Sequence, residues 1–407
     1  MENNLKNFFE KHYQSYLEIY KKLVSTNSFT SNPDGVNENG NLIAQAFSDL
    51  GFIPENVQSL NPEFGSHLVL TRKGTSDNRV GLITHLDTVF SPEEEEANNF
   101  SWRIEDDRVY GPGTNDIKGG TVIILMVMEA LNHLANDIFE EITWVVLANA
   151  AEERWSYDFG ELCRDRLGED GLAALIFEAG YVDDKAFSVV RSRKGMAVYD
   201  INVEGKSAHA GNNHQFGANA IVQLSQVIQK VEALTNYDKD LTYNIGVASG
   251  GSVPNRVPQS ASARGEMRTF SKDIFNQGVK DLLAINTIKP VKSAADGYPC
   301  KLNIEVILEN DPWPRNKATD NLIQIWRETG KSLGMDIVLE DRGGLSDGNQ
   351  LWEFVPTIDG LGPNGRNAHC SEHSPDGSKE QEYATLSSLI PKAVLNTMAI
   401  KKLITGG

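Results

Sequence analysis

The 407-residue sequence contains few cysteines, and they lie far apart. Three are present, Cys163, Cys300 and Cys370, and this odd, widely spaced set does not indicate a disulfide framework. The first residues, MENNLKNFFEKHYQ, lack the apolar segment and the small-residue cleavage site of a secretory signal. We therefore expect a cytoplasmic, reduced protein.

Basic residues and long apolar runs are also scarce. The chain has 38 Lys and Arg against 56 Asp and Glu, a formal net charge of -18. Proteins that bind the phosphate backbone need a basic surface, so we expect no nucleic-acid partner. The longest apolar run, residues 122–128, is far shorter than the roughly 20 residues that cross a bilayer. We expect no membrane partner either.

Apolar runs alternate with helical patterns along much of the chain, which favours an α/β fold. Helical spacing predicts a first helix around residues 13–24 and a second over 42–50, ending at Gly51. Continuous apolar strands separated by helices are typical of a mostly parallel sheet with helices on both faces. The predicted strands are 67–70, 80–84, 142–147, 174–177 and 356–361, and a further helix covers 120–134.

The middle of the chain has a different texture, with partly alternating strands. Strands are predicted in 186–204, 242–248, 261–269 and 301–308, with helices over 217–231 and 271–284. This β-α-β-β-α-β order is typical of a ferredoxin-like α+β open sandwich. We therefore predict a discontinuous larger domain, 1–193 and 311–407, and an inserted domain, 194–310. The acidic run 93–96 is interpreted as a solvated loop.

Two motifs near the predicted strand ends carry chemistry-bearing side chains. In THLDTVF, His85 and Asp87 are two apart and project from one side of a strand, so the carboxylate could fix the tautomer of a metal-binding histidine. In YGPGTNDIKGG, Asp116 occupies the place of the third glycine of a dinucleotide fingerprint, where it would repel a pyrophosphate. That motif instead suits a carboxylate held in a tight turn, although an ordinary helix cap fits the local pattern equally well.

The pair Glu152 and Glu153 follows the predicted strand 142–147. Adjacent carboxylates beside an apolar strand repel each other, and a divalent cation would make the pair favourable. The two residues must lie where the strand ends and the backbone turns, because side chains in a continuing strand alternate between faces. One could then bind the ion while the other acts as a base; a solvated charged loop is the alternative.

Glu178 closes the next strand, and His369 lies in the loop GPNGRNAHCSEHS, with His373 as its competitor. Together with the preceding motifs, these residues place two histidines and three carboxylates after strands of one sheet, where α/β folds have their sites. This ligand mixture suits zinc, with cobalt or manganese as alternatives. It is sufficient for two ions bridged by one carboxylate.

The chain resembles the di-zinc hydrolases that include glutamate carboxypeptidase, aminoacylase, acetylornithine deacetylase and succinyl-diaminopimelate desuccinylase. The motifs occur in order along nearly the whole chain, and the nearest likeness is to glutamate carboxypeptidase. They are HLDTV, GPGTNDIKGG, the Glu-Glu pair, FEAG, RKGM, EGKSAHAG, GGSVPNRVP, GEMR, GGLSDGN and the late histidine.

The resemblance implies a role for each candidate metal ligand. Asp116 would bridge two divalent ions, His85 and Glu178 would complete one of them, and Glu153 and His369 the other. The residues RWSY after the Glu-Glu pair depart from the pattern, since small residues are commoner there. The loop after His369 is also longer than usual.

The resemblance also implies the reaction. A metal-bridging hydroxide would attack an amide bond next to a free carboxylate, with Glu152 as general base and proton shuttle and Asp87 orienting the first histidine. His209 would stabilise the oxyanion, and Asn255 and Arg268 would hold the substrate carboxylate, for which an arginine fork is well suited. A surface salt bridge is the alternative for Arg268, as it is for the neighbouring Arg256.

These inferences define a zinc-dependent hydrolase, either a carboxypeptidase-type peptidase or an N-acyl-amino-acid deacylase. A non-catalytic relative that binds metal or ligand is the alternative from another class. The inserted domain is expected to form a homodimer, and the sequence leaves open whether His209 acts in its own subunit or in the partner.

Overall fold

The computed structural model describes residues 1–168, 171–180 and 186–406. The chain forms two compact units, which are described separately. The larger comprises Met1–Arg191, Arg315–Asp341 and Ser346–Gly407, and the smaller comprises Ser192–Pro314 and Arg342–Leu345. The predicted boundaries, 193/194 and 310/311, differ from these divisions by a few residues. The segment 342–345 was assigned to the larger domain, but backbone contacts attach it to the smaller unit, where Lys194 N–H donates to Arg342 O at 3.1 Å.

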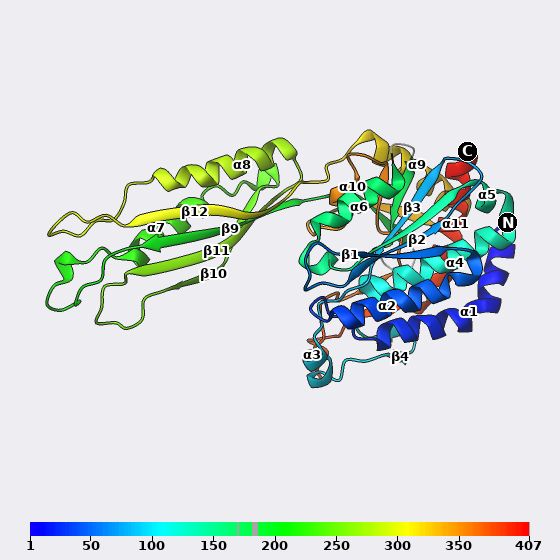
Figure 1. Ribbon diagram of the computed structural model, residues 1–407, viewed down its shortest axis with the longest axis horizontal. Helices are drawn as coiled ribbons and strands as arrows, with labels where there is room; N and C mark the ends of the chain where they lie inside the picture. Colours follow the sequence, from blue (N-terminus) through cyan, green and yellow to red (C-terminus); the bar gives the residue numbers. More distant parts are fainter. Residues whose placement is uncertain (169–170, 181–185, 407) are drawn as a thin grey trace. The chain divides into compact units, whose positions relative to one another are not determined.

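A six-stranded sheet forms the centre of the larger unit (Figure 1). Its order is β1 (Ile53–Gln58), β2 (Ser66–Arg72), β6 (Thr143–Asn149), β3 (Arg79–His85), β7 (Gly171–Ile176) and β14 (Thr357–Ile358). The strands β6, β3, β7 and β14 pair in parallel, whereas β1 and β2 pair antiparallel because a short connection joins them. The expected α/β sheet is confirmed, and its parallel part carries the predicted apolar strands. The predicted strand 356–361 is reduced to β14.

Helices supply most of the remaining core of the larger unit. One apolar cluster joins the sheet to α1 (Glu2–Ser25), α2 (Pro33–Ala46), α4 (Gly119–Leu134), α9 (Lys317–Ser332) and α11 (Leu389–Thr405). On β3, α6 (Tyr157–Leu167) packs so closely that a Cβ at Gly81 would lie 2.9 Å from Leu167. Helix α5 spans Asn136–Glu141, and α10 spans Gly348–Leu351. Both α1 and α4 match predicted helices.

One apolar segment, Thr114–Leu134, is long enough to cross a membrane by length and composition. It contains α4, and 78% of the tested window is buried inside the protein, as in the core helix of a soluble fold. The expectation of a second helix over 42–50 was partly wrong. Helix α2 starts earlier, ends at Ala46, and is followed by a 3-10 turn, Ser48–Leu50, that stops at Gly51 with φ 76°.

The smaller unit is an antiparallel four-stranded sheet with two helices (Figure 1, green to yellow). Its order is β10 (Thr242–Gly250), β11 (Ser260–Thr269), β9 (Gly195–Glu204) and β12 (Lys301–Asn310). Helices α7 (Ala220–Glu232) and α8 (Lys272–Ala284) share its apolar core. The predicted β-α-β-β-α-β order is therefore the observed one.

Short elements complete the fold. Strands β4 (Arg103–Glu105), β5 (Arg108–Tyr110), β15 (Gly365–Arg366) and β16 (Tyr383–Thr385) form a small antiparallel sheet, and β8 (Ala186–Arg193) pairs with β13 (Asp336–Arg342). The acidic run 93–96 is not a loop. It lies in the short helix α3 (Pro92–Ala97), which Ser91 caps by accepting from Glu94 N–H. Acidic residues in a first helical turn are favoured by the helix dipole.

Candidate metal centre

The five predicted ligands gather at the carboxyl ends of the parallel strands of the larger unit. His85 is the last residue of β3, Glu178 follows β7, and Glu153 lies in a 3-10 turn after β6. Asp116 lies in the turn before α4, and His369 follows β15. This edge of a parallel sheet is where α/β folds bind their ligands.

Asp116 faces both histidines, one with each carboxylate oxygen. His85 Nε2 lies 3.0 Å from Oδ1, and His369 Nε2 lies 3.4 Å from Oδ2. Ligand atoms of His85, Asp116 and Glu153 all lie within 4.8 Å of one another. A carboxylate between two histidines is the arrangement expected of a residue that bridges two ions.

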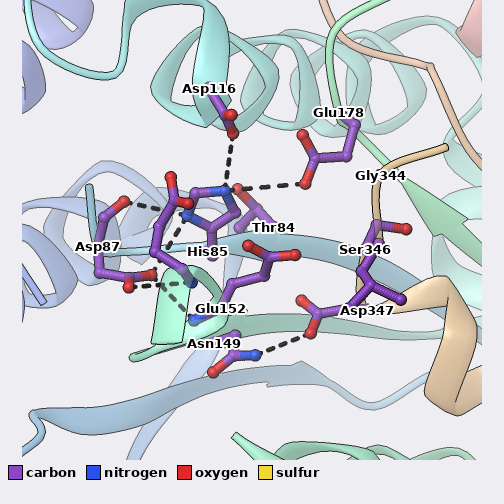
Figure 2. A network of polar contacts seen from close by, with 12 residues as sticks. Thr84, His85, Asp87, Asp116, Asn149, Glu152, Glu178, Gly344, Ser346 and Asp347 are labelled. Atoms are coloured by element: carbon purple, nitrogen blue, oxygen red, sulfur yellow. Dashed lines mark hydrogen bonds and ion pairs between the residues drawn. The ribbon is translucent and has the colours of Figure 1, made fainter. Parts of the chain in front are cut away.

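Each histidine also faces a second carboxylate. His85 Nε2 is 3.7 Å from Glu178 Oε1, and His369 Nε2 is 3.1 Å from Glu153 Oε2. Figure 2 shows the links from His85 to Asp116 and Glu178. The structure thus brings together the two groups of side chains that the sequence predicts, and their role as metal ligands stays a prediction. The structure also favours His369 over His373, because His369 Nε2 faces the carboxylates of both Asp116 and Glu153.

The electrostatics of the cluster favour a cation. Burial raises the pKa of Glu153, and the nearby Asp116 raises it further. Hydrogen bonds with Asp116 and Glu153 raise the pKa of His369 to about 11. The excess negative charge that holds a proton on this imidazole would also hold a divalent cation, which displaces the proton when it binds. The donor set therefore fits metal ions.

Asp87 contacts both His85 and the turn that carries the glutamate pair. His85 Nδ1 donates to Asp87 O at 3.0 Å and lies 3.3 Å from Oδ1, so Nε2 is directed toward the cluster. The backbone N–H groups of Glu152 and Glu153 donate to Oδ1 and Oδ2 at 3.1 and 3.3 Å. Thr30 Oγ1 donates to Oδ2 at 2.6 Å. Asp87 thus fixes the histidine tautomer through its carbonyl oxygen and carboxylate, and its carboxylate fixes the start of the 3-10 turn.

The side chain of Glu152 lies beside the predicted ligands. Burial raises its pKa well above the ordinary value; His85 opposes this shift, and the carboxylates of Glu153, Glu178 and Asp347 add to it. A raised pKa makes the carboxylate a better proton acceptor. This is the property that a general base and proton shuttle needs.

Glu382 is a buried residue of the site that sequence reasoning missed. Its Oε1 accepts from the N–H groups of Asn115 and Asp116 at 2.8 and 3.1 Å. Burial, followed by the charge of Asp116, raises its pKa to about 8. The only sequence signal is a glutamate directly before the buried pair Tyr383 and Ala384. Glu382 holds the backbone of the turn that carries Asp116.

In the smaller unit, two of the predicted residues lie on adjacent segments. Ala210 N–H donates to Asn255 O at 2.9 Å, and His209 forms a β-bridge with Arg256. The N–H groups of Gly211 and Asn212 both donate to His209 Nδ1 at 3.1 Å. Because Nδ1 is an acceptor, the neutral ring carries its proton on Nε2. His209 therefore presents a hydrogen-bond donor, as an oxyanion-stabilising residue must.

Both arginines considered for substrate binding have partners within the smaller unit. Arg268 Nε donates to Glu266 Oε1 at 2.8 Å, and its Nη2 donates to Oε2 at 3.0 Å. Arg256 Nη2 donates to Gln259 Oε1 at 2.7 Å. The Arg268 fork is thus engaged by a carboxylate of its own strand, so the substrate-binding roles of Asn255 and Arg268 stay predictions.

Comparisons with known proteins agree with this site. Residues 191–286 match the family model of a peptidase dimerisation domain, M20_dimer. The chain is 28% identical to carboxypeptidase G2 of Pseudomonas sp. (strain RS-16), over 92% of this chain and 85% of that protein. It is 27% identical to the acetylornithine deacetylase of Buchnera aphidicola subsp. Acyrthosiphon pisum (strain 5A), over 60% and 65%. The fold is similar to that of aminopeptidase PepT from Bacillus cereus ATCC 10987, with TM-score 0.75, 20% identity, and coverage of 96% and 98%.

The fold, the ligand cluster and these relatives define a metal-dependent hydrolase. The chain is similar to metallopeptidases and deacylases, and it combines an α/β domain with an inserted domain that matches the M20 peptidase dimerisation model.

Proposed function

We propose that this chain is a zinc-dependent, carboxypeptidase-like enzyme that cleaves the amide bond next to a free carboxylate. The observation that carries the proposal is the placement of Asp116 between His85 and His369, with Glu152 beside them. The similarity to carboxypeptidase G2 over most of both chains supports peptide substrates with a C-terminal amino acid.

Two zinc ions fit the donors of the larger unit. His85, Asp116 and Glu178 would hold one ion, and Asp116, Glu153 and His369 would hold the other. Imidazole and carboxylate ligands are those that zinc prefers, with cobalt and manganese as alternatives. When bound, the ions supply Lewis-acid polarisation of the scissile carbonyl and lower the pKa of water.

The protein's own groups move the proton. Glu152 accepts a proton from the attacking water on its carboxylate and returns it to the nitrogen of the leaving amine, which cannot depart as an anion. Asp87 keeps the His85 ring in its tautomer and holds the glutamate turn. His209 carries its proton on Nε2, a donor suited to a developing oxyanion.

The assembly and location that we propose are a cytoplasmic homodimer formed through the smaller unit. The match of residues 191–286 to a peptidase dimerisation domain supports the dimer. The three cysteines, Cys163, Cys300 and Cys370, are free, which is compatible with a reducing compartment. Light scattering of the purified protein tests the dimer.

An N-acyl-amino-acid deacylase is the second candidate, and the similarity to acetylornithine deacetylase favours it. Both reactions need the same metal centre and shuttle, and they differ in the acyl group that the site accepts. A non-catalytic binding role is disfavoured because the base Glu152 and all five metal ligands are present.

Mass-spectrometric detection of released amino acid tests the proposal. The purified protein is incubated with dipeptides and with N-acetyl, N-succinyl and N-benzoyl amino acids, with and without a chelator. We expect chelator-sensitive release that zinc restores and that Glu152→Gln lacks. Release from acylated amino acids alone would establish the deacylase instead. No release from a protein with confirmed bound metal would overturn both enzymatic assignments.

A further inference from the structure

Four consecutive backbone N–H groups at the end of β6 donate to side chains. They belong to residues 150–153, here named the glutamate turn. Ala150 N–H donates to His67 Nδ1 at 3.1 Å, and Ala151 N–H donates to Asn149 Oδ1 at 3.0 Å. The next two donate to the carboxylate of Asp87. A turn whose donors all have side-chain acceptors is held in one backbone conformation.

Buried residues supply these acceptors. His67 is 1% exposed, Asn149 is 0% exposed and Asp87 is 1% exposed. Asn149 Nδ2 also donates to Asp347 Oδ1 at 2.8 Å, which directs Oδ1 toward Ala151 (Figure 2). Water therefore cannot readily replace a lost acceptor, and a change at any of them acts on the turn.

His67 is held in the required tautomer by Asp158. Since Nδ1 accepts from Ala150 N–H, the ring proton of the neutral imidazole lies on Nε2, which is 3.2 Å from Asp158 Oδ2. Asp158 also accepts from Ser156 Oγ at 2.5 Å and from Leu60 N–H at 2.6 Å. Burial opposes ionisation of Asp158, but these hydrogen bonds, led by that of His67, hold its pKa well below the ordinary value.

Ser156 lies within the segment RWSY, where the chain departs from the family pattern, and Asp158 directly follows it. Their contacts give this departure a role, because both side chains lie against His67; Ser156 Oγ is 3.4 Å from its Nε2. The segment that follows Glu152 and Glu153 thus folds back against His67 and, through it, supports the glutamate turn.

We propose that His67, oriented by Asp158, is a positioning residue for hydrolysis. It fixes Ala150 at the start of the glutamate turn, and through the backbone it aims Glu152 at the reacting atoms and Glu153 at the metal. The proposal rests on the proposed function, since it assigns a residue that serves the same site.

Two substitutions test the roles of the two ring nitrogens of His67 one at a time. In His67→Asn, the amide Oδ1 takes the place of Nδ1 and can still accept from Ala150 N–H, but the donor to Asp158 is lost. In His67→Gln, the amide Nε2 takes the place of the ring Nε2 and can donate to Asp158, but the acceptor for Ala150 is lost. The variants are similar in polarity, so each serves as the control for the other.

The experiment measures kcat, KM and bound zinc for both variants at saturating zinc, with thermal unfolding as the check of folding. Loss of a group that orients a metal site typically costs about 10- to 100-fold in activity or metal affinity. We expect kcat of His67→Gln to fall about 10- to 100-fold, while KM changes less than about twofold and kcat of His67→Asn falls less than about fivefold. Asp158→Leu removes the acceptor that keeps the ring proton on Nε2, so the proton can move to Nδ1 and kcat should fall as in His67→Gln.

Equal kcat in both His67 variants, whether retained or lost, would overturn the proposal, because positioning through Ala150 requires them to differ. Failure of the proposed function is a separate outcome, since the wild-type protein would then show no chelator-sensitive release. Should both His67 variants unfold, Asp158→Leu decides: unchanged kcat in the folded variant would refute the role of the pair.

Discussion

Gly120 packs tightly against the backbone near the predicted metal centre, and this leads to a strong prediction. Gly120 lies in α4, and a Cβ added there would be 1.9 Å from the carbonyl oxygen of Phe177, the residue before Glu178. Real Cβ atoms essentially never lie closer than 3.0 Å to such atoms, so Gly120→Ala must separate α4 from the end of β7 by at least about 1.1 Å.

The magnitude follows from two opposed effects. Alanine is favoured over glycine in a helix interior by about 1 kcal/mol. Overpacking typically costs about 1–3 kcal/mol, and the higher figure applies because a backbone carbonyl cannot move away by changing rotamer. We expect Gly120→Ala to lower the free energy of unfolding by about 2 kcal/mol. The displacement also exceeds the roughly 0.5 Å within which a functional group must be held, so zinc affinity should fall with it.

Gly40→Ala is the matched control. Gly40 also lies in a helix, α2, but an added Cβ there would meet Leu86 Cδ1 at 3.5 Å and Leu68 Cβ at 3.9 Å, which are ordinary contacts. It should stabilise the protein by about 0.5–1 kcal/mol. Urea unfolding and competitive zinc titration measure both variants. If Gly120→Ala has the same free energy of unfolding and the same zinc affinity as Gly40→Ala, the argument from close packing is refuted.

Three further predictions concern the site itself. In Glu152→Gln, kcat should fall by about 10²- to 10⁴-fold, while elemental analysis should still find both metal ions. Loss of metal instead would mean that the base and ligand roles of Glu152 and Glu153 are exchanged. Glu382→Leu leaves the buried N–H groups of Asn115 and Asp116 without an acceptor. The free energy of unfolding, measured by urea titration, should therefore fall by about 2–4 kcal/mol. Glu382→Gln keeps an acceptor, so its free energy of unfolding should fall less. In chelator-treated protein, the pKa of His369 is raised to about 11, from an ordinary value of about 6.5. Protonated His369 therefore contributes fully to stability below about pH 6.5, and this contribution is progressively lost as the pH rises toward 11. The unfolding temperatures of the wild type and of His369→Gln should therefore converge as the pH rises from 6 to 10. A difference that widens with pH would contradict this prediction.

The sequence predicts those parts of the site that follow from the ends of strands. Apolar runs locate β3, β6 and β7, and charged residues directly after such runs must lie at one edge of a parallel sheet. His85, Glu153 and Glu178 are found in this way. The glutamate pair was also expected at a backbone turn, because side chains in a strand alternate, and a 3-10 turn is what the structure shows.

Residues that hold the backbone could not be found in this way. His67 lies inside β2 and Glu382 before β16, and nothing in either local pattern distinguishes a side chain that accepts a backbone N–H from one that faces solvent. Such a contact depends on the direction of a peptide group in another element. The antiparallel addition of β1 and β2 escaped prediction for a similar reason, since strand direction is set by pairing partners rather than by apolar content.

Asp87 shows why the glutamate pair and the histidine must be considered together. One oxygen of its carboxylate faces His85 and accepts from Glu152 N–H, and the other accepts from Glu153 N–H. The same group therefore sets the direction of His85, a predicted metal ligand, and the backbone positions of Glu152 and Glu153, the predicted base and a second predicted ligand. Two adjacent carboxylates can do different work because the 3-10 turn separates their side chains, and that turn persists because its four N–H groups have buried acceptors. Cations bound at the predicted site would balance the repulsion of the pair, and the geometry of the pair is fixed by residues outside the predicted ligand set.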